Sequence, residues 1–160
     1  MTRSRAGKFR SAPGPCIARR SGVSNNAQPE EPPTLLVVDD DPDIRMLLCD
    51  LFKREGFHVH VATDGASAIS YLDQHEPPSA ILMDLLMPGI LGTSVLAYLS
   101  SKRRFDGVPV AIVSSSLHLA PAGYPMFTKP LKFAPLLKFV RNACNAPSAP
   151  SAPSAPQAAL

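Results

Sequence analysis

The sequence is poor in cysteine and contains no long run of apolar residues. Its three cysteines, Cys16, Cys49 and Cys144, are an odd number and lack the close spacing of a metal site. Neither a disulfide framework nor a zinc module is therefore expected. No run of 18 apolar residues occurs, which argues against a membrane-spanning helix, and no apolar signal segment follows the N-terminal arginines. We expect a cytoplasmic protein, in a compartment that keeps thiols reduced.

Regular apolar periodicity is also missing from both ends of the chain. Residues 1–33 hold 6 Lys and Arg against 2 Asp and Glu, and residues 143–160 are almost wholly Ala, Pro and Ser. Such segments bury too little apolar surface to offset the entropy of ordering. We therefore expect a disordered basic N-terminal arm (1–33) and a disordered Ala/Pro/Ser tail (143–160). Scattered charges without interleaved aromatics favour a solvated arm over one that binds nucleic acid or anionic lipid.

The remaining residues, 34–142, are expected to form one domain with 10 basic and 11 acidic side chains. Short aliphatic runs predict strands covered on both faces, at 35–39, 58–62, 80–84, 110–114 and 126–128. Apolar residues at helical spacing predict helices at 43–55, 66–74, 93–102 and 133–142. This alternation predicts an α/β fold with a doubly wound, five-stranded parallel sheet, because parallel neighbours need right-handed crossovers.

Several of the expected strands end at a side chain suited to chemistry. Asp39 and Asp40 come at the end of the first strand, Asp84 at the third, Ser114 at the fourth and Lys129 at the fifth. The carboxyl ends of parallel strands meet at one edge of a sheet, so we expect these side chains to lie close together. Carboxylates hold hard divalent cations through oxygen, and a lysine pairs with phosphate. The pattern predicts a site for a divalent cation and a phosphoryl group.

Short motifs follow one another in a fixed order along this domain. They are Leu35–Asp41 (LLVVDDD) with Pro42-Asp43-Ile44-Arg45 after it, Asp64-Gly65, Asp84-Leu-Leu-Met87-Pro88 with Gly92, and Lys129-Pro130. Asp40 and Asp84 are 44 positions apart. Each motif alone is common, but their order and spacing resemble the receiver domain of the response-regulator family of two-component signal transduction, over residues 34–142. The resemblance implies the flavodoxin-like fold of chemotaxis regulators, with the strand order 2-1-3-4-5.

The resemblance also implies a role for the acidic residues. Asp84 is the expected phosphoacceptor, which takes a phosphoryl group from a phosphohistidine and becomes an aspartyl phosphate. Mg²⁺ is the expected cofactor, held by Asp39, Asp40, Asp84 and the backbone carbonyl of Leu86. A run of aspartates at this place can also serve to cap a helix and to complement its dipole, and this remains our interpretation of Asp41 and Asp43.

Two further residues complete the implied machinery. Lys129 is expected to pair with the phosphoryl oxygens, and Pro130 after it is preceded by a cis bond in the family. Ser114 is expected to hydrogen-bond the phosphoryl group as the switch residue. In the family, side chains two positions after the phosphoacceptor and two after the switch residue help to orient the hydrolytic water. Here these residues are Leu86 and Ser116, which predicts a long-lived aspartyl phosphate.

Taken as a whole, the resemblance predicts a stand-alone signalling switch and not a metabolic enzyme. A sensor histidine kinase or a histidine phosphotransfer protein is the expected phosphoryl donor. The output is expected to pass to an unknown downstream protein or to a second copy in a homodimer, because the sequence shows no DNA-binding domain and no membrane span. The alternative is a receiver-like interaction module that takes no phosphate. The joint presence of Asp39, Asp40, Asp84, Ser114 and Lys129 disfavours that alternative.

The connection between the last two expected strands departs from the family. Ser114 and Lys129 are 15 positions apart, and two prolines and a glycine interrupt the segment between them. The helix that the family has there is therefore expected to be shortened or absent. The expected signalling surface consists of Tyr124, Met126 and Phe127, with Leu117 and Leu119 as further contacts.

Four histidines, His58, His60, His75 and His118, raise the question of a second metal site or of phosphotransfer. His58 and His60 alternate along one expected strand, and no matching partner lies near them in the sequence. Exposed strand-face histidines are the more common case, so the sequence alone assigns no site to them.

Overall fold

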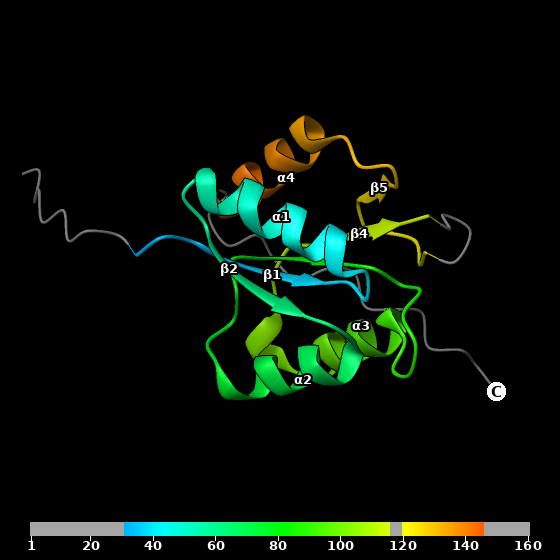
Figure 1. Ribbon diagram of the computed structural model, residues 1–160. Coiled ribbons are helices and arrows are strands. Elements are labelled where there is room, and N and C mark those ends of the chain that lie inside the picture. The colour runs from blue at the N-terminus through cyan, green and yellow to red at the C-terminus, as the bar shows by residue number, and fades with distance from the viewer. Residues whose placement is uncertain (1–30, 116–119, 146–160) are drawn as a thin grey trace, which may run out of the picture. The chain divides into compact units, whose positions relative to one another are not determined.

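Five parallel strands form the centre of the computed structural model, which describes residues 31–115 and 120–145 (Figure 1). The strands are β1 (Thr34–Val38), β2 (His58–Ala62), β3 (Ala80–Met83), β4 (Val110–Ser114) and β5 (Met126–Thr128). Their order across the sheet is β2-β1-β3-β4-β5, and every neighbouring pair is parallel. The predicted doubly wound fold and its strand order are thereby confirmed.

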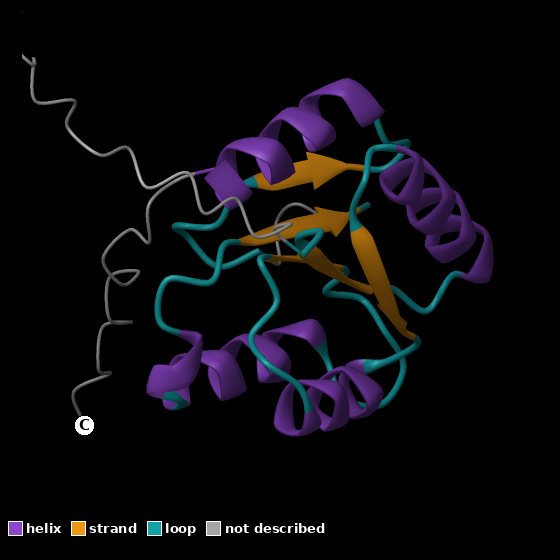
Figure 2. Ribbon diagram, turned by 90° about the vertical axis from the view of Figure 1, so that its left-hand side faces the viewer, coloured by secondary structure: helices purple, strands orange, loops and turns teal. Residues whose placement is uncertain are grey.

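Helices cover both faces of this sheet (Figures 1 and 2). One face carries α1 (Pro42–Arg54) and α4 (Phe133–Asn145), and the other carries α2 (Gly65–Gln74) and α3 (Gly92–Ser101). A single turn of 3-10 helix, η1 (Arg103–Phe105), follows α3. None of the described helices is both long and apolar enough to cross a lipid bilayer.

The sheet separates two apolar cores. Leu36 and Ile81 point toward α2 and α3, whereas their neighbours Leu35 and Leu82 point toward α1 and α4. Because successive residues of a strand face opposite sides, a strand covered on both sides has to be apolar throughout. Burying each such aliphatic side chain contributes roughly 1.5–3 kcal/mol of stability. The aliphatic runs of the three inner strands follow from this packing.

Side-chain caps define where two helices begin. The carboxylate of Asp41 accepts hydrogen bonds from the backbone N–H of Asp43 at 2.9 Å and of Ile44 at 3.4 Å at the start of α1. The carboxylate of Asp64 accepts one from the N–H of Ser67 at 2.7 Å, and the Ser67 hydroxyl accepts one from the N–H of Asp64 at 3.2 Å. This reciprocal capping box starts α2 directly after the loop that leaves β2. The capping role predicted for Asp41 is confirmed.

The connection from β4 to β5 contains no helix in its described part, which comprises Ser115 and residues 120–125. Gly123 has a φ angle of 98°, a left-handed conformation that favours glycine, and it forms part of a turn before β5. The described part of this connection therefore lacks the family's helix, as predicted. Ser116 and the predicted contacts Leu117 and Leu119 lie outside the described residues.

Element ends differ from the prediction by a few residues. β1 and β3 end one residue earlier than expected, so Asp39 and Asp84 directly follow their strands. α4 runs three residues further than expected, to Asn145, into the segment assigned to the tail. Ala143 and Cys144 pack against the core beneath α1 and α4, which explains why the helix continues. The predictions for residues 1–30 and 146–160 concern segments outside the described residues.

Candidate functional site

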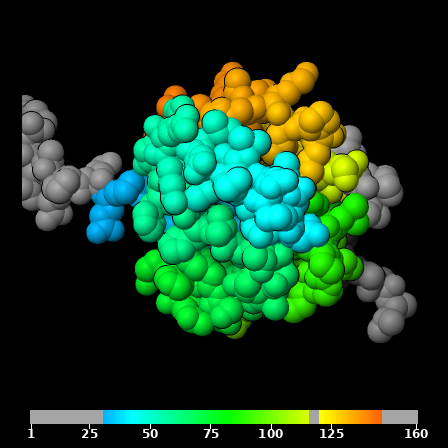
Figure 3. Space-filling model, viewed as in Figure 1, coloured from blue at the N-terminus to red at the C-terminus, as the bar shows by residue number. Residues whose placement is uncertain are grey.

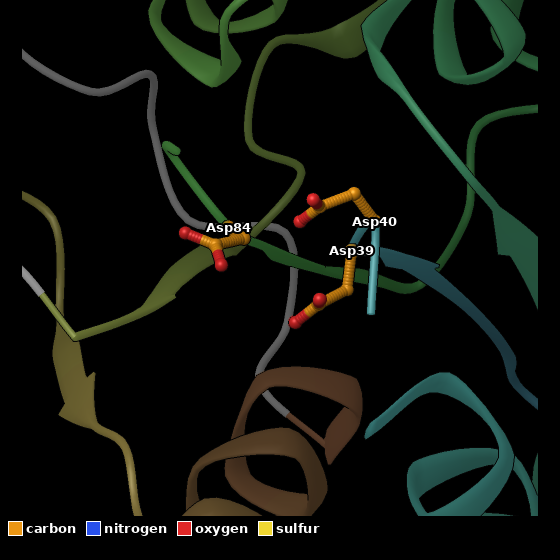
Figure 4. Close-up of side chains that lie close together, drawn as sticks. All are labelled: Asp39, Asp40 and Asp84. Atoms are coloured by element: carbon orange, nitrogen blue, oxygen red, sulfur yellow. The ribbon is translucent and has the colours of Figure 1, made fainter. Parts of the chain in front are cut away.

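The predicted site residues meet at the carboxyl edge of the sheet. Asp39 follows β1, Asp84 follows β3, Ser114 is the last residue of β4, and Lys129 follows β5. Figure 4 shows the side chains of Asp39 and Asp40, from the end of β1, beside that of Asp84. The parallel arrangement brings together residues that are up to 90 positions apart in the sequence. The convergence predicted from the strand ends is therefore present.

Three carboxylates form the centre of this edge. Asp39, Asp40 and Asp84 each offer an oxygen atom, and these atoms all lie within 4.8 Å of one another. Asp39 is 1% exposed and Asp84 is 5% exposed, whereas Asp40 is open to solvent. The strand ladder fixes the two buried residues: the N–H of Asp39 donates to the carbonyl of Ala62 at 3.2 Å, and that of Asp84 donates to the carbonyl of Val38 at 2.8 Å.

Lys129 supplies a positive charge between two of the carboxylates. Its Nζ lies 2.7 Å from Oδ2 of Asp39 and 2.7 Å from Oδ2 of Asp84. The N–H of Lys129 donates to the carbonyl of Ser114 at 3.3 Å, which continues the ladder between β4 and β5, and the Lys129-Pro130 bond is cis. The backbone thus places the lysine side chain over the acidic residues.

The second oxygen of Asp84 is held from two other sides. The hydroxyl of Ser114 donates to Oδ1 of Asp84 at 2.9 Å, and the backbone N–H of Leu86 donates to the same oxygen at 3.0 Å. Both oxygens of this buried carboxylate therefore have polar partners, which fixes its orientation. Leu86 contacts Asp84 through its N–H, and the metal contact expected of its carbonyl remains a prediction.

Burial and neighbouring charges shift the pKa values of Asp39 and Lys129 in opposite directions. Burial raises the pKa of Asp39, although Lys129 and the N–H of Asp41 partly offset this effect. Burial also lowers the pKa of Lys129, but the neighbouring Asp39 and Asp84 outweigh it and the pKa is raised overall. The lysine is therefore protonated at neutral pH, and one positive charge faces three acidic groups. Oδ2 of Asp39 has no hydrogen-bond partner besides this ion pair among the described residues.

Sequence reasoning missed one contact in the first loop of the site. The Nη1 of Arg45 donates to the backbone carbonyl of Asp39 at 2.6 Å, while the N–H of Asp41 donates to Oδ1 of Asp39 at 2.9 Å. Together these bonds hold the loop that carries Asp39 and Asp40 against the start of α1. In the sequence, Arg45 belongs to the segment Pro42-Asp43-Ile44-Arg45 that follows the aspartate run, but that pattern predicted no role for its side chain.

Two glycines allow the loop after β3 to pack tightly. A Cβ atom on Gly92 would lie 2.4 Å from the carbonyl oxygen of Asp84, and one on Gly65 would lie 2.5 Å from that of Ile90. Real Cβ atoms do not approach backbone atoms so closely. The loop from Leu85 to Leu91 thus depends on glycine at the start of α2 and at the start of α3.

The residues of the expected signalling surface do not share one face. Tyr124 is half-buried against the core beneath α2 and α3, whereas Phe127 packs against the opposite core, with its ring centroid 5.8 Å from that of Phe139. Met126 lies between them in the chain and is 37% exposed. Tyr124 and Phe127 thus pack on opposite sides of the sheet, and the signalling role of these three residues remains a prediction.

The chain is similar to known proteins over most of the domain that carries this site. The family model of the response regulator receiver domain matches residues 35–123. The transcriptional activator protein PfeR of Pseudomonas aeruginosa is 39% identical over 83 residues, which are 52% of this chain and 26% of PfeR. Protein Rrf1 of Nitratidesulfovibrio vulgaris is 30% identical over 115 residues, which are 70% of this chain and 83% of Rrf1. The chain thus spans about a quarter of PfeR and most of Rrf1.

Solved structures show the same fold. The receiver domain of the Francisella response regulator 1452 superposes with a TM-score of 0.60 at 28% sequence identity, and the match covers 70% of this chain and 96% of that domain. Response regulator protein TrrA of Thermotoga maritima, in complex with Mg²⁺ and BeF, superposes with a TM-score of 0.62 at 24% identity, over 69% of this chain and 98% of TrrA.

Proposed function

Because the chain belongs to the response regulator receiver family, we propose that Asp84 accepts a phosphoryl group from a phosphohistidine donor. Receiver domains are signalling modules of two-component systems and not metabolic enzymes. The donor in such systems is a sensor histidine kinase or a histidine phosphotransfer protein. Phosphorylation of Asp84 would then change the conformation of the domain and so pass on the signal.

The surroundings of Asp84 are the observation that carries this proposal. Asp84 is 5% exposed, and its carboxylate is oriented by Ser114 and Leu86 on one oxygen and by Lys129 on the other. A carboxylate held in one orientation at the edge of a sheet is suited to attack a phosphorus atom that approaches from solvent.

The donor set also fits a magnesium ion. Three carboxylate oxygens within 4.8 Å of one another form a hard oxygen site, and a single lysine balances only part of their charge. Asp39, Asp40 and Asp84 would hold the ion, with the carbonyl of Leu86 as a further ligand. When bound, Mg²⁺ supplies positive charge that offsets the negative charge of the phosphoryl oxygens.

The transfer itself exchanges one bond to phosphorus for another. An oxygen of Asp84 forms a bond to phosphorus as the bond between phosphorus and the donor's imidazole nitrogen breaks, and its electron pair stays on that nitrogen. Lys129 gains phosphoryl oxygens as partners in place of the free carboxylate. Ser114, now 2.9 Å from Oδ1 of Asp84, exchanges this contact for one with a phosphoryl oxygen. Its movement is the first step of the proposed switch.

Intact-mass measurement tests the phosphoacceptor. The purified protein is incubated with Mg²⁺ and a small phosphodonor such as acetyl phosphate, and one added phosphoryl group is expected. Asp84→Asn keeps the shape of the side chain but removes the nucleophile, so no phosphate should be added. Asp50→Asn, on the exposed surface of α1, is the matched control and should behave as the wild type. Equal phosphorylation of the Asp84→Asn protein would overturn the assignment. A wild type that takes no phosphate would favour the interaction-module alternative.

Magnesium binding is tested separately by calorimetry. Asp40→Ala removes an exposed carboxylate of the trio, and its Mg²⁺ affinity should fall by roughly tenfold or more because few other ligands are available. Asp43→Ala changes a nearby acidic residue in the first turn of α1, outside the trio, and serves as the control. Equal Mg²⁺ affinity of both variants would contradict the role given to Asp40.

A further inference from the structure

Three histidines lie together along the edge strand β2 and at the end of α2, outside the acidic site. The ring centroids of His58 and His60, on the edge strand β2, are 5.1 Å apart, and those of His60 and His75 are 5.7 Å apart. His75 is far from β2 in sequence, but α2 runs back along the strand and ends beside it (Figure 1). The view of His58 and His60 as strand residues without a partner is therefore corrected.

His75 is held in place although it is exposed. Its Nδ1 lies 3.0 Å from the backbone carbonyl of Tyr71, and its ring stacks on the Tyr71 ring with a centroid distance of 4.4 Å and an interplanar angle of 16°. A carbonyl can only accept, so this contact favours the tautomer with the hydrogen on Nδ1, in which Nε2 is the nitrogen available to a cation. Arg104 donates to the backbone carbonyl of His75 and fixes the end of α2 as well.

This arrangement resembles the way metal-binding histidines are usually supported. A ligating imidazole typically donates its second N–H to a carbonyl, which fixes its tautomer and its orientation. His60 is half-buried in the middle of the group, with its ring centroid 4.6 Å from that of Tyr71. Two of the three imidazoles are thus oriented by neighbouring groups before any ligand arrives. His58 is exposed and has room to turn.

The separations of the His60 ring from the rings of His58 and His75 are compatible with ligands to a shared ion. A Zn²⁺–nitrogen bond of about 2.0–2.1 Å and roughly 1.1 Å from nitrogen to ring centre place two tetrahedrally arranged imidazole centroids roughly 5 Å apart. The measured separations are 5.1 and 5.7 Å. Among the described residues, the acidic trio is the group whose ligand atoms already converge within 4.8 Å. The nitrogens of the three histidines do not all lie that close together, so binding requires a side-chain rotation, for which the exposed His58 has room.

We propose that His58, His60 and His75 bind a divalent transition-metal cation such as Zn²⁺ through imidazole nitrogen, with water in the remaining position. Imidazole selects borderline cations of this class, whereas the carboxylates after β1 and β3 select Mg²⁺. The bound ion would connect the edge strand β2 to the end of α2 through shared ligands and so stabilise this part of the domain. β2 and α2 both lie on the face of the molecule that Figure 3 presents. The site does not depend on the proposed phosphoryl transfer.

Titration calorimetry with Zn²⁺ tests the proposal directly. The full chain, freed of any polyhistidine tag, is titrated at neutral pH with Mg²⁺ in excess, so that the carboxylate site is competed. One Zn²⁺ per chain is expected. His60→Gln and His75→Gln should each weaken binding more than tenfold. His118→Gln, a change to the remaining histidine, which lies outside the described residues, is the matched control and should bind as the wild type.

Thermal unfolding gives a second, independent measurement. Zn²⁺ should raise the melting temperature of the wild type and of His118→Gln, but not that of His60→Gln, because a cation stabilises only the state that binds it. His58→Gln changes an exposed side chain, so it keeps the test valid if His60→Gln fails to fold. Absence of Zn²⁺ binding would overturn the proposal. Undiminished Zn²⁺ binding in all three variants, His58→Gln, His60→Gln and His75→Gln, would also overturn it. Loss of Zn²⁺ binding in Asp84→Asn would place the ion at the carboxylates and would overturn it as well.

Discussion

The ammonium nitrogen of Lys129 lies 2.7 Å from Oδ2 of Asp84, and this contact joins the ends of β5 and β3 across 45 residues of sequence. The same nitrogen lies 2.7 Å from Oδ2 of Asp39. A single cation therefore links two buried carboxylates that would otherwise repel each other. In the proposed reaction the same lysine would turn from these carboxylates to the phosphoryl oxygens, so its substitution tests both stability and function.

Lys129→Met should destabilise the protein most strongly when divalent cations are absent. Removing one partner of a buried ion pair typically costs about 3–5 kcal/mol. The Lys129 side chain is 19% exposed, so we expect a loss of unfolding free energy near the lower end of that range. Urea unfolding at neutral pH with and without Mg²⁺ measures the effect, and Mg²⁺ should restore part of the loss. Lys132→Met, at an exposed position, is the control; a loss of equal size there would contradict the argument.

Leu86→Asn should shorten the life of the aspartyl phosphate. Leu86 is 41% exposed, so the change is tolerated by the fold, and asparagine offers the attacking water a hydrogen bond that leucine lacks. We expect hydrolysis to become roughly three- to tenfold faster because the water is better positioned. The decay of the phosphorylated species is followed by intact mass after removal of the donor. Leu86→Met keeps an apolar side chain and should leave the rate unchanged, and equal rates for Leu86→Asn and wild type would rule out the idea.

Gly92→Ala should slow phosphorylation as well as reduce stability. The new Cβ would lie 2.4 Å from the Asp84 carbonyl oxygen and 2.8 Å from the Cα of Leu85, so the backbone beside the phosphoacceptor has to move. Overpacking of this kind costs about 1–3 kcal/mol. Gly65→Ala is the comparison, because its close contacts are with Ile90 instead. At a temperature where both variants are folded, Gly92→Ala should be phosphorylated more slowly; equal rates would show that the loop can adjust.

The cap of α2 should make stability depend on pH. A hydrogen bond from the N–H of Ser67, assisted by the hydroxyl of Thr63, lowers the pKa of Asp64 below its ordinary value of 3.8. A carboxyl whose pKa is lower in the folded state stabilises the fold above its unfolded pKa and loses this contribution as the pH falls through the folded pKa. Asp64→Asn retains the cap but cannot titrate.

Urea denaturation at a series of pH values on both sides of the ordinary pKa of aspartate measures the difference in unfolding free energy between wild type and Asp64→Asn. It should be largest above about pH 5 and should shrink as the pH falls below the ordinary pKa of an aspartate, while both proteins remain folded. A difference that stays constant with pH would show that the ionised carboxylate adds nothing beyond the hydrogen bond that asparagine also makes.

Local patterns in the sequence were sufficient to predict the layout of the fold. The aliphatic run before Asp39 and that before Asp84 predicted buried strands, because a strand covered on both faces has no polar positions. The spacing of Ile44, Leu48 and Leu51 predicted a helix, because these residues share one face at 3.6 residues per turn. Once the strands were known to be parallel, their charged ends had to meet at one edge, so the acidic trio, Ser114 and Lys129 could be placed together from sequence.

Contacts between distant residues were decided only by the tertiary structure. The hydrogen bond from Arg45 to the Asp39 carbonyl depends on how α1 packs, and the opposite directions of Tyr124 and Phe127 depend on the register of β5 and the turn before it. The approach of His75 to His60 likewise requires that α2 fold back along β2. Sequence periodicity reports which face of an element is buried, but not which side chain of a distant element lies against it. The direction and register of packing determine that second property, and they arise from the whole core at once.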